Sequence, residues 1–474
     1  MHLKKLSIYS FITFLFLVPI RFAEAGGFAT ARFGSEWGHV TADHPTSIYY
    51  NPAGMALGLG TRIFFEGIIA YRQASYERPA GAIGNVSDSQ TGTPTDGIDA
   101  NSGTGRLSNV LGSPFLGIVT DFGIEGLGVG AAFFVPFGGQ ASWQRNNNFI
   151  DSSRFPGAVD GAQRWATIEG SIRALYGSVG AAYRLKGPRL SFGTSFNVVK
   201  QDLNTIRARN ATGTDDLVQP NGNVAEGRSL VNASATTMSI GAGVIWQPTR
   251  HSWLGFSYQS KPGFGETKLP GTLSNKLGVT AVDEVDVDFV HNLPDIFRLG
   301  GRIRPSSDIE FRLNGAYTRW SSYDNQCLVD NTNPDANCAL GDNGELTEET
   351  VGAIVNIHRD WHDNFTIAAG MSYWPDEELE LLVGGAFDSN AVPDETLDAS
   401  LMDMNKFSAT LGGRWNVGDS LKVNVTYSHV FYASRTVDLR EPGAVFDPPS
   451  TVPDQAGTYT QSIGLLNLGA ELSF

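Results

Sequence analysis

The sequence predicts an all-β protein: a closed, 14-stranded antiparallel transmembrane β-barrel. Three observations support this fold class. Apolar and polar residues alternate with a period of two over most of the chain, the connections between these segments are alternately short and long, and an export leader precedes them. The mean hydropathy of −0.14 excludes a bundle of transmembrane helices. It fits a barrel, whose apolar and polar residues average out.

Residues 1–25 have the composition of a signal peptide. Two lysines precede an apolar stretch from Ile8 to Ile20, and Ala23-Glu24-Ala25 offers a cleavage site. The apolar stretch is too short to span a bilayer as a helix. We therefore expect an exported protein whose mature chain begins at Gly26.

The C-terminal segment shows the alternation most clearly. One face carries Leu466, Leu468, Ala470, Leu472 and Phe474, and the other carries Asn467, Gly469, Glu471 and Ser473. Residues 406–415 and 190–199 repeat the pattern. This period is the one that a strand with one apolar and one polar face requires. In a barrel, the apolar face meets lipid.

Fourteen segments have the character of strands. They lie near residues 62–72, 114–121, 127–136, 165–185, 189–207, 236–247, 252–267, 284–304, 309–320, 361–374, 379–387, 405–416, 421–432 and 460–474. Short turns such as Lys186-Gly187-Pro188 alternate with long polar stretches such as 137–164 and 321–360. Tight turns at one end and long loops at the other are typical of bacterial outer-membrane barrels. We therefore expect a barrel over residues 61–474, in the bacterial outer membrane.

Residues 26–60 show no sustained alternation and are rich in glycine, alanine and small polar residues. This segment has two possible places, a periplasmic tail or a plug in the lumen. Fourteen strands enclose more space than their own side chains fill, and an open hole of that size would leak solutes. We therefore expect a plug.

The composition and the motifs exclude several classes of function. A formal charge of −15 argues against a nucleic-acid partner, because phosphate binding needs a basic face. The sequence contains no H-E-x-x-H, G-x-S-x-G or Walker motif. Ser428 and His429 are adjacent, so in a strand they face opposite ways and cannot cooperate. We expect neither an enzyme nor a bound cofactor.

A further set of motifs extends over nearly the whole mature chain. Asn51-Pro52-Ala53 precedes the first strand, Asn292-Leu293-Pro294 and Tyr317-Thr318-Arg319-Trp320-Ser321 lie in later strands, and the last strand ends with Phe474. Together they resemble the FadL family of transporters for long-chain fatty acids and other hydrophobic compounds. The resemblance implies a 14-stranded barrel plugged by an N-terminal hatch, with Asn51, Pro52 and Ala53 as the hatch motif.

The resemblance also implies an inward kink in the third strand, which opens a lateral window in the wall. The matching residues are Pro136, Phe137, Gly138 and Gly139. Their chemistry agrees, because proline cannot donate a ladder hydrogen bond and a pair of glycines loosens the backbone. The alternative is that Pro136 only ends a strand at its loop.

The function implied by the resemblance is passive uptake across the outer membrane. A long-chain fatty acid or related hydrophobic compound would bind in the lumen and leave sideways through the window after the hatch rearranges. An aromatic hydrocarbon or alkane channel of the same fold is the main alternative, and a general porin or a surface adhesin are further ones. The substrate stays open, and we expect a monomer.

Basic residues toward the outer end of the fifth strand could pair with a ligand carboxylate. They are Lys200, Arg207 and Arg209. The alternative is that they are solvated or bind the phosphates of lipopolysaccharide in the surrounding outer-membrane lipid. A ladder of Glu284, Asp286 and Asp288 has two interpretations, a Ca²⁺ site or a hydrated wall of the lumen.

Cys327 and Cys338 lie eleven residues apart in the longest polar loop. In an exported protein such a pair favours a disulfide over a metal site. Neither cysteine has a neighbouring Cys or His at zinc spacing. We therefore expect a disulfide and no bound metal.

Overall fold

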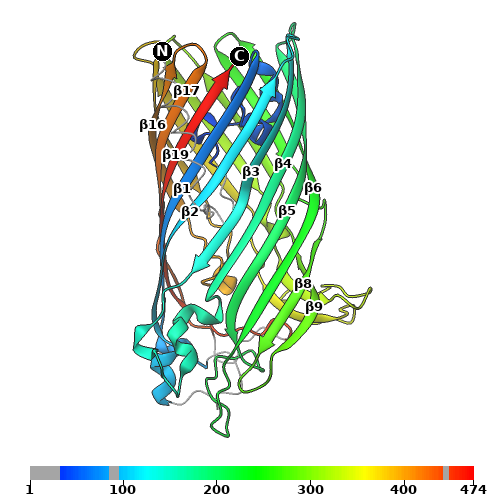
Figure 1. Ribbon diagram of the computed structural model, residues 1–474, viewed down its shortest axis with the longest axis vertical. Helices are drawn as coiled ribbons and strands as arrows, with labels where there is room; N and C mark the ends of the chain where they lie inside the picture. Colours follow the sequence, from blue (N-terminus) through cyan, green and yellow to red (C-terminus); the bar gives the residue numbers. More distant parts are fainter. Residues whose placement is uncertain (1–31, 85–94, 441–447) are drawn as a thin grey trace, which may run out of the picture.

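The computed structural model describes residues 32–84, 95–440 and 448–474, and it confirms a closed antiparallel barrel of 14 strands (Figure 1). The first strand, β1 (Thr61–Arg78), pairs with β2 (Gly103–Thr120) and with the last strand, β19 (Gly457–Ser473), which closes the wall. The signal peptide expected at residues 1–25 lies outside the described residues. No helix in the described ranges is long and apolar enough to cross a membrane.

Nineteen strand segments form the 14 wall strands, because five wall strands are each divided into two segments. The divided pairs are β7–β8, β9–β10, β11–β12, β13–β14 and β17–β18. Between β2 and β19 the segments are β3 (Leu127–Ser142), β4 (Glu169–Leu185), β5 (Leu190–Arg209), β6 (Gly227–Thr249), β7 (Ser252–Gln259), β8 (Thr267–Lys276), β9 (Asp283–His291), β10 (Ile296–Ile303), β11 (Ile309–Thr318), β12 (Asn325–Asp330), β13 (Ala353–His358), β14 (Asn364–Tyr373), β15 (Leu379–Asp388), β16 (Lys406–Val417), β17 (Leu421–Tyr432) and β18 (Arg435–Val437).

Four neighbouring wall strands are interrupted along one row of partners. Gln259 pairs with Ile296, Ile296 with Thr318, and Thr318 with Asn364, and each of these residues borders a break. Side chains replace the ladder there. Asp295 Oδ1, for example, accepts hydrogen bonds from the Tyr258 hydroxyl (2.8 Å) and the Lys261 amide (3.1 Å). The outer parts of these strands therefore form a four-stranded extension, β8-β9-β12-β13, which β8 joins to wall strand β6.

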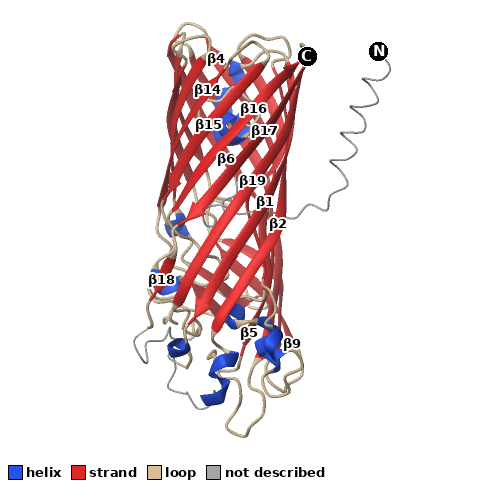
Figure 2. Ribbon diagram, turned by 90° about the vertical axis from the view of Figure 1, so that its left-hand side faces the viewer, coloured by secondary structure: helices blue, strands red, loops and turns tan. Residues whose placement is uncertain are grey.

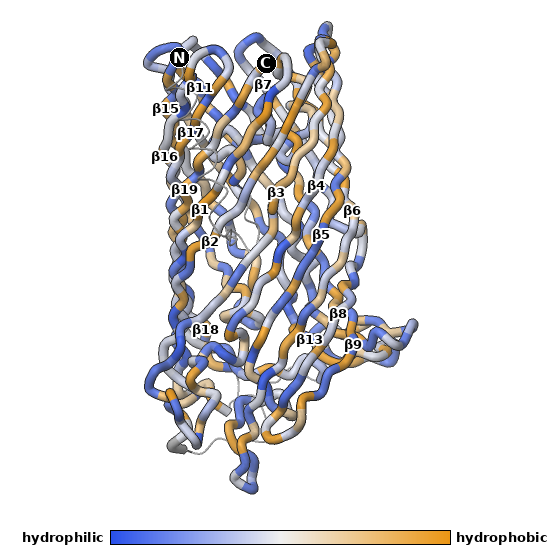
Figure 3. Tube along the Cα trace, in the orientation of Figure 1, coloured by the Kyte–Doolittle hydropathy of each residue, from blue (hydrophilic) through white to orange (hydrophobic). Residues whose placement is uncertain are grey.

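The two faces of each strand follow the predicted alternation. On β16, Phe407 and Leu411 are 54% and 64% exposed on the outer face, whereas Ser408 and Thr410 are buried on the inner face. Hydrophobic residues recur along the wall strands (Figure 3), and many large ones are exposed. The outer surface therefore has the apolar band that contact with lipid requires.

The two ends of the barrel differ in the length of their connections. Short turns and the C-terminus lie at one end, and long loops with short helices lie at the other (Figure 2). The loop helices are η3 (Ala80–Ala82), η4 (Thr95–Ala100), η5 (Asn147–Phe149), η6 (Pro156–Asp160), η7 (Ala162–Trp165) and η9 (Asp394–Thr396), whereas η8 (Trp320–Ser322) lies at the break between β11 and β12. In an outer-membrane barrel the short-turn end is periplasmic and the long-loop end is extracellular.

Residues 32–60, here called the N-terminal segment, lie inside the barrel near the short-turn end (Figure 1, dark blue). The segment contains η1 (Ser35–Trp37), α2 (Ser47–Tyr50) and η2 (Pro52–Leu57). Phe33, Ala53 and Met55 are at most 1% exposed, and η2 packs against β3, β4, β5 and β6. The described residues of the segment thus pack within the lumen, and their role as a plug stays a prediction.

Candidate functional site

Asn51 fastens the N-terminal segment to the wall. Its Nδ2 donates hydrogen bonds to the carbonyl oxygens of Val40 (2.8 Å), Val244 of β6 (3.1 Å) and Phe256 of β7 (3.3 Å). Its Oδ1 accepts from the amide of Ala53 (3.1 Å) and so caps η2. Pro52 occupies the first position of η2, where a helix needs no backbone N–H. The three residues of the Asn-Pro-Ala motif thus act together at one contact with the wall.

Glycines on the inner face of the wall make room for this contact. A Cβ atom at Gly193 would overlap the backbone of Pro52 and Ala53, one at Gly243 would overlap the side chain of Asn51, and one at Gly128 would overlap the backbone of Met55. A glycine in a strand commonly marks a close approach of another backbone. The wall is therefore shaped for the N-terminal segment.

The β2–β3 ladder covers only the first part of β3. It runs from the pair Thr120↔Val129 to the pair Phe115↔Phe134. Beyond Phe134, the described residues of these two strands form no further ladder pair before the isolated bridge Leu107↔Trp143. Pro136 lies where the β3–β4 register is irregular, but β3 continues to Ser142. Pro136 therefore does not end the strand.

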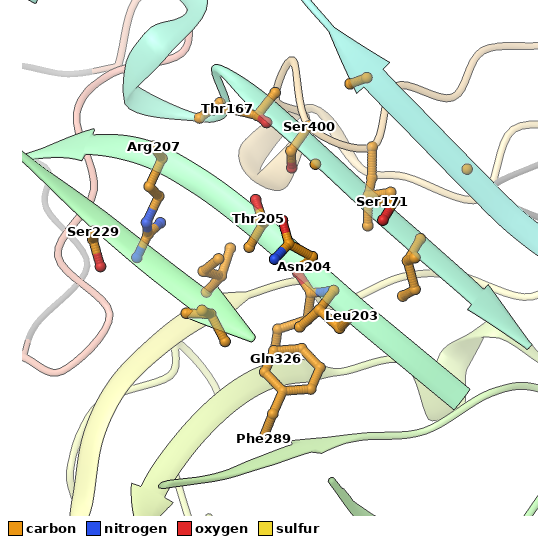
Figure 4. Close-up of a pocket in the computed structure, with 18 of the residues that line it drawn as sticks. Thr167, Ser171, Leu203, Asn204, Thr205, Arg207, Ser229, Phe289, Gln326 and Ser400 are labelled. Atoms are coloured by element: carbon orange, nitrogen blue, oxygen red, sulfur yellow. The ribbon is translucent and has the colours of Figure 1, made fainter. Parts of the chain in front are cut away.

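A cavity that is open to solvent lies at the extracellular side of the lumen and is called the outer cavity here (Figure 4). Its lining is mainly apolar and includes Ala141, Ile172, Leu203, Val231, Phe289, Leu328, Val355, Ile357 and Leu401. Gly139 and Ala141 belong to the part of β3 that is unpaired with β2. The cavity therefore adjoins the interrupted ladder.

Two arginines line the outer cavity, and they differ in their partners. Arg359 donates to Gln326 Oε1 (2.8 and 2.6 Å), Asp398 Oδ2 (3.0 Å) and Ser400 Oγ (3.0 Å). Arg207 enters from β5 beside Ser229 (Figure 4). In the described ranges its guanidinium forms no hydrogen bond and no ion pair. Arg359 is thus held by the protein, while Arg207 lines the cavity without a comparable hydrogen bond in the described ranges.

The three predicted basic residues lie in different places. Arg207 and Arg209 have the inward parity of β5, but only Arg207 lines the outer cavity. Lys200 is on the outer face, 3.7 Å from Asp202. Lys200 therefore does not lie with Arg207 on the lumen side, and carboxylate binding by these residues stays a prediction. Arg359 could not be predicted from the sequence, because it borders a strand break and belongs to no motif.

A row of aromatic rings connects the outer cavity with β3. Phe289 lines the cavity and lies 5.2 Å from His291, which is 6.0 Å from Tyr323. Tyr323 is 5.8 Å from Trp320, which in turn lies 6.2 Å from Phe137 of β3; all distances are between ring centroids. Trp320 and Tyr323 are buried. The rings form a packed series between the cavity and the interrupted ladder.

The acidic ladder of β9 has the opposite orientation to the one expected. Glu284 and Asp286 are exposed, whereas Val287 and Phe289 face the interior. The prediction that these carboxylates form a hydrated lumen wall was therefore wrong. In the described part of the chain, no group of three or more His, Cys, Asp or Glu residues is arranged to hold a metal ion.

Cys327 and Cys338 form a disulfide at the extracellular side. Cys327 lies in β12 rather than in a loop, and it is fully buried. The disulfide encloses the turn that follows β12 and thereby restrains one corner of the four-stranded extension. Leu328, the next residue of β12, lines the outer cavity.

The model of the outer membrane protein transport protein family (OMPP1/FadL/TodX) matches residues 23–474. The chain belongs to this family. It is therefore a transport protein of the bacterial outer membrane, as the sequence motifs predicted. The family is one of transport proteins and not of enzymes.

Relatives and solved structures agree with this assignment. This transport protein is 22% identical to the long-chain fatty acid transport protein of Escherichia coli K12 over 334 residues, which cover 63% of this chain and 69% of the relative. It is also similar to the structure of a Pseudomonas aeruginosa FadL homologue (TM-score 0.72, 16% identity, 96% and 99% of the two chains). The P. putida toluene transporter TodX gives a TM-score of 0.63 at 14% identity, covering 92% and 98%. At these identities the structural likeness supports the fold.

Proposed function

We propose that this protein takes up hydrophobic compounds that end in a carboxylate, of which long-chain fatty acids are the main class. The observation that carries the proposal is Arg207, a cation without a protein partner in the described ranges, at the edge of an apolar cavity. A cation removed from water is costly unless it is paired. A carboxylate can accept two parallel hydrogen bonds from a guanidinium, and an acyl chain suits the apolar lining.

The route after binding would follow the aromatic row toward β3. Phe137 lies at the end of this row, beside the stretch in which β2 and β3 form no ladder. Unpaired backbone groups at a strand edge that faces lipid are costly in a membrane. Because of this cost, we expect the interruption of the β2–β3 ladder to serve a function. We infer that Pro136, Phe137, Gly138 and Gly139 border a lateral exit into the membrane.

The N-terminal segment would act as the hatch that closes the axial route. Its described residues fill the lumen near the periplasmic end and are tied to the wall through Asn51. A ligand that cannot pass straight through the barrel is directed to the side. Residues 26–60 thus form the hatch and residues 61–474 the barrel in this proposal.

A neutral aromatic hydrocarbon is the second candidate. The observation that favours it is the aromatic row itself, because Phe289, Trp320 and Phe137 can stack with an aromatic ligand. Such a ligand would make no use of Arg207. The two candidates therefore predict different effects on ligand binding when Arg207 is replaced.

Competition binding separates the two candidates. Purified protein in detergent is loaded with a fluorescent long-chain fatty acid, which is displaced by dodecanoate, methyl dodecanoate or toluene. We expect dodecanoate to compete about 10- to 100-fold better than its ester, because a hydrogen bond to a charged group contributes about 1.5–3 kcal/mol. Arg207→Gln should remove this preference and Lys200→Gln on the outer face should keep it. Equal competition by all three compounds in the wild type would favour the hydrocarbon candidate.

Cross-linking tests the lateral exit. Asn109 Nδ2 donates to Gln140 O (3.0 Å) across the outer end of the interrupted ladder. Cysteines at these two positions, joined by a short thiol cross-linker, should tie β2 to β3 and lower fatty-acid uptake by cells. The control is the same linkage between Thr194 and Ala242, which are already ladder partners in β5 and β6. Unchanged uptake in the Asn109/Gln140 variant would exclude this exit.

A further inference from the structure

The outer face of β19, β1 and β2, which lie side by side in the wall (Figure 2), changes from apolar to polar along the strands. Ile69 of β1 has Leu466 of β19 as its ladder partner, and both belong to the apolar part. Tyr71 forms the next row on this face with Val110 and Gly464. The two rows beyond it contain only polar side chains: Gln73, Ser108 and Ser462 in one, and Ser75, Arg106 and Thr460 in the other. The apolar band of this part of the wall therefore ends at the row of Tyr71.

Tyr71 marks the boundary between membrane and water. Its side chain is 47% exposed on the outer face, and its hydroxyl lies 3.1 Å from Ser108 Oγ in the first polar row. Tyrosines are enriched at the membrane–water interface, where an apolar ring and a polar hydroxyl both find suitable surroundings. The outer face of β5 changes in the same way, because Phe196 and Val198 are followed outward by Lys200. The polar rows therefore lie where the headgroups of the outer leaflet begin.

An open hollow lies in these polar rows, on the outside of the barrel. Its lining comes from the outer ends of β1, β2 and β19 and from Gln144, which follows β3. The hydroxyl groups of Ser75 and Thr460 lie 2.7 Å apart in it. The Gln144 amide donates a hydrogen bond of 2.8 Å to Arg106 O and so holds the β3 side against β2. The hollow thus presents hydroxyl and amide groups toward the outer leaflet.

Arg106 is the cation of this hollow. It is exposed, and within residues 32–84, 95–440 and 448–474 its guanidinium forms no hydrogen bond and no ion pair. Two other cations of the outer face share one carboxylate, since Asp202 lies 3.1 Å from Arg173 and 3.7 Å from Lys200. Among the described residues no carboxylate lines the hollow, and Glu77 lies one ladder row further outward. The positive charge of Arg106 is therefore left for a ligand.

We propose that the hollow binds the phosphorylated sugar headgroup of lipopolysaccharide, the lipid of the outer leaflet of the bacterial outer membrane. A guanidinium can form two parallel hydrogen bonds with a phosphate, and the hydroxyl and amide groups can donate to and accept from those of a sugar. The acyl chains would lie along the apolar rows, against Ile69, Val110 and Leu466. A phospholipid headgroup would satisfy Arg106 but would leave most of the polar rows without partners.

The hollow also adjoins the interrupted β2–β3 ladder. Leu107, which forms the isolated bridge to Trp143, is part of its lining. A lipid bound here would therefore be a fixed neighbour of the proposed lateral exit. Its binding does not depend on that exit or on the substrate, because every group that holds it lies on the outer face or at the end of β3.

The test follows the access of a water-soluble maleimide to the hollow in the full-length protein. Ser108→Cys places one free thiol there, because Cys327 and Cys338 are joined in a disulfide. The protein in detergent micelles is titrated with diphosphorylated lipid A, dephosphorylated lipid A or phosphatidylglycerol. We expect diphosphorylated lipid A to slow labelling at concentrations about 10- to 100-fold lower than either other lipid, because it alone supplies both the charged group and the sugar. Asn148→Cys, in an exposed extracellular loop, should be labelled at an unchanged rate.

Replacing Arg106 in the Ser108→Cys background tests the assignment. Arg106→Gln should lower the affinity for diphosphorylated lipid A to that for the dephosphorylated lipid, and Arg106→Lys should retain part of the difference. Arg250→Gln removes the same charge at an exposed periplasmic turn and should behave as the parent. A heat-modifiable band on electrophoresis shows that each variant folds. If diphosphorylated lipid A protects the thiol equally well in Arg106→Gln, or if phosphatidylglycerol protects it as well as lipid A does, this inference is wrong.

Discussion

Asn51 of the N-terminal segment donates a hydrogen bond of 3.1 Å to the backbone carbonyl of Val244 in the barrel wall. The same amide group also reaches Phe256 O on the neighbouring strand and Val40 O within the segment. One side chain thus joins two wall strands to the middle of the segment. Because Gly243 leaves room for this side chain, the contact depends on both partners.

Replacing this side chain tests the anchor. Asn51→Ala removes the hydrogen bonds that this amide makes within the segment and to two wall strands, a loss of about 1–3 kcal/mol. Because the barrel ladder is untouched, we expect local release of the segment rather than unfolding of the barrel. Hydrogen exchange of residues 47–57 should become about 5- to 150-fold faster, and the protein in planar bilayers should conduct small ions. Asn148→Ala, in an exposed loop, is the control. Unchanged exchange in Asn51→Ala would show that the anchor lies elsewhere.

The lipid-facing surface can be tested at Leu411. This side chain is 64% exposed on the outer face of β16, and its ladder partners Val383 and Tyr427 are exposed beside it. Leu411→Arg should destabilise the barrel by about 2–4 kcal/mol if the residue lies near the midplane of the bilayer. Reversible unfolding in lipid vesicles measures this loss. Leu346→Arg, at an exposed position of an extracellular loop, should leave stability nearly unchanged; equal losses would contradict the membrane placement.

The barrel itself could be predicted from the sequence because one face of each strand must be apolar. The same alternation also assigns each side chain of a membrane strand to the inner or the outer face. Phe196 and Val198 face lipid, so Lys200 shares their outer face and Arg207 has the opposite parity. Above the membrane this signal fails, because both faces of a strand meet water or packed loops. This is why the orientation of Glu284, Asp286 and Asp288 was assigned incorrectly.

The strand breaks and the partners of Arg359 could not be predicted in this way. The predicted segments near 252–267, 284–304, 309–320 and 361–374 include or border the breaks, which depend on side chains such as Asp295 that replace the ladder. Arg359 meets Asp398 and Gln326 only after the chain has closed into a barrel. Such long-range contacts leave no periodic pattern in the sequence.

The disulfide should hold the four-stranded extension in place. The bond between Cys327 and Cys338 closes a short loop, and the chain-entropy estimate for a loop of this size is about 3 kcal/mol. We expect the Cys327→Ser, Cys338→Ser double variant to show faster hydrogen exchange over β12 and β13 and weaker binding in the outer cavity, which Leu328 lines. The barrel strands β1 and β2 serve as an internal control. A loss of amide protection throughout the barrel would instead show that the disulfide stabilises the whole barrel.

The interaction of Asp398 with Arg359, which lines the outer cavity, should depend on pH. Burial would raise the pKa of this carboxyl, but Arg359 and the hydrogen bonds from Ser400 and Leu401 outweigh burial and hold its pKa below the usual range. Because the pKa of Asp398 is lower in the folded than in the unfolded protein, its interaction with Arg359 stabilises the fold fully above the unfolded pKa of about 3.9. This stabilisation is lost as the pH falls through the folded-state pKa of Asp398. Arg359 should therefore be released only in strong acid.

This pH dependence can be measured on the loop that carries Asp398. We expect amide protection of residues 396–404 to be constant from pH 7 to pH 5 and to fall below about pH 4. Asp398→Asn should show weaker protection at neutral pH and no such fall, because the titrating group is gone. Asp342→Asn, an exposed carboxylate in another loop, should keep the wild-type profile. A fall of protection in Asp398→Asn over the same pH range would mean that a different carboxylate controls the loop.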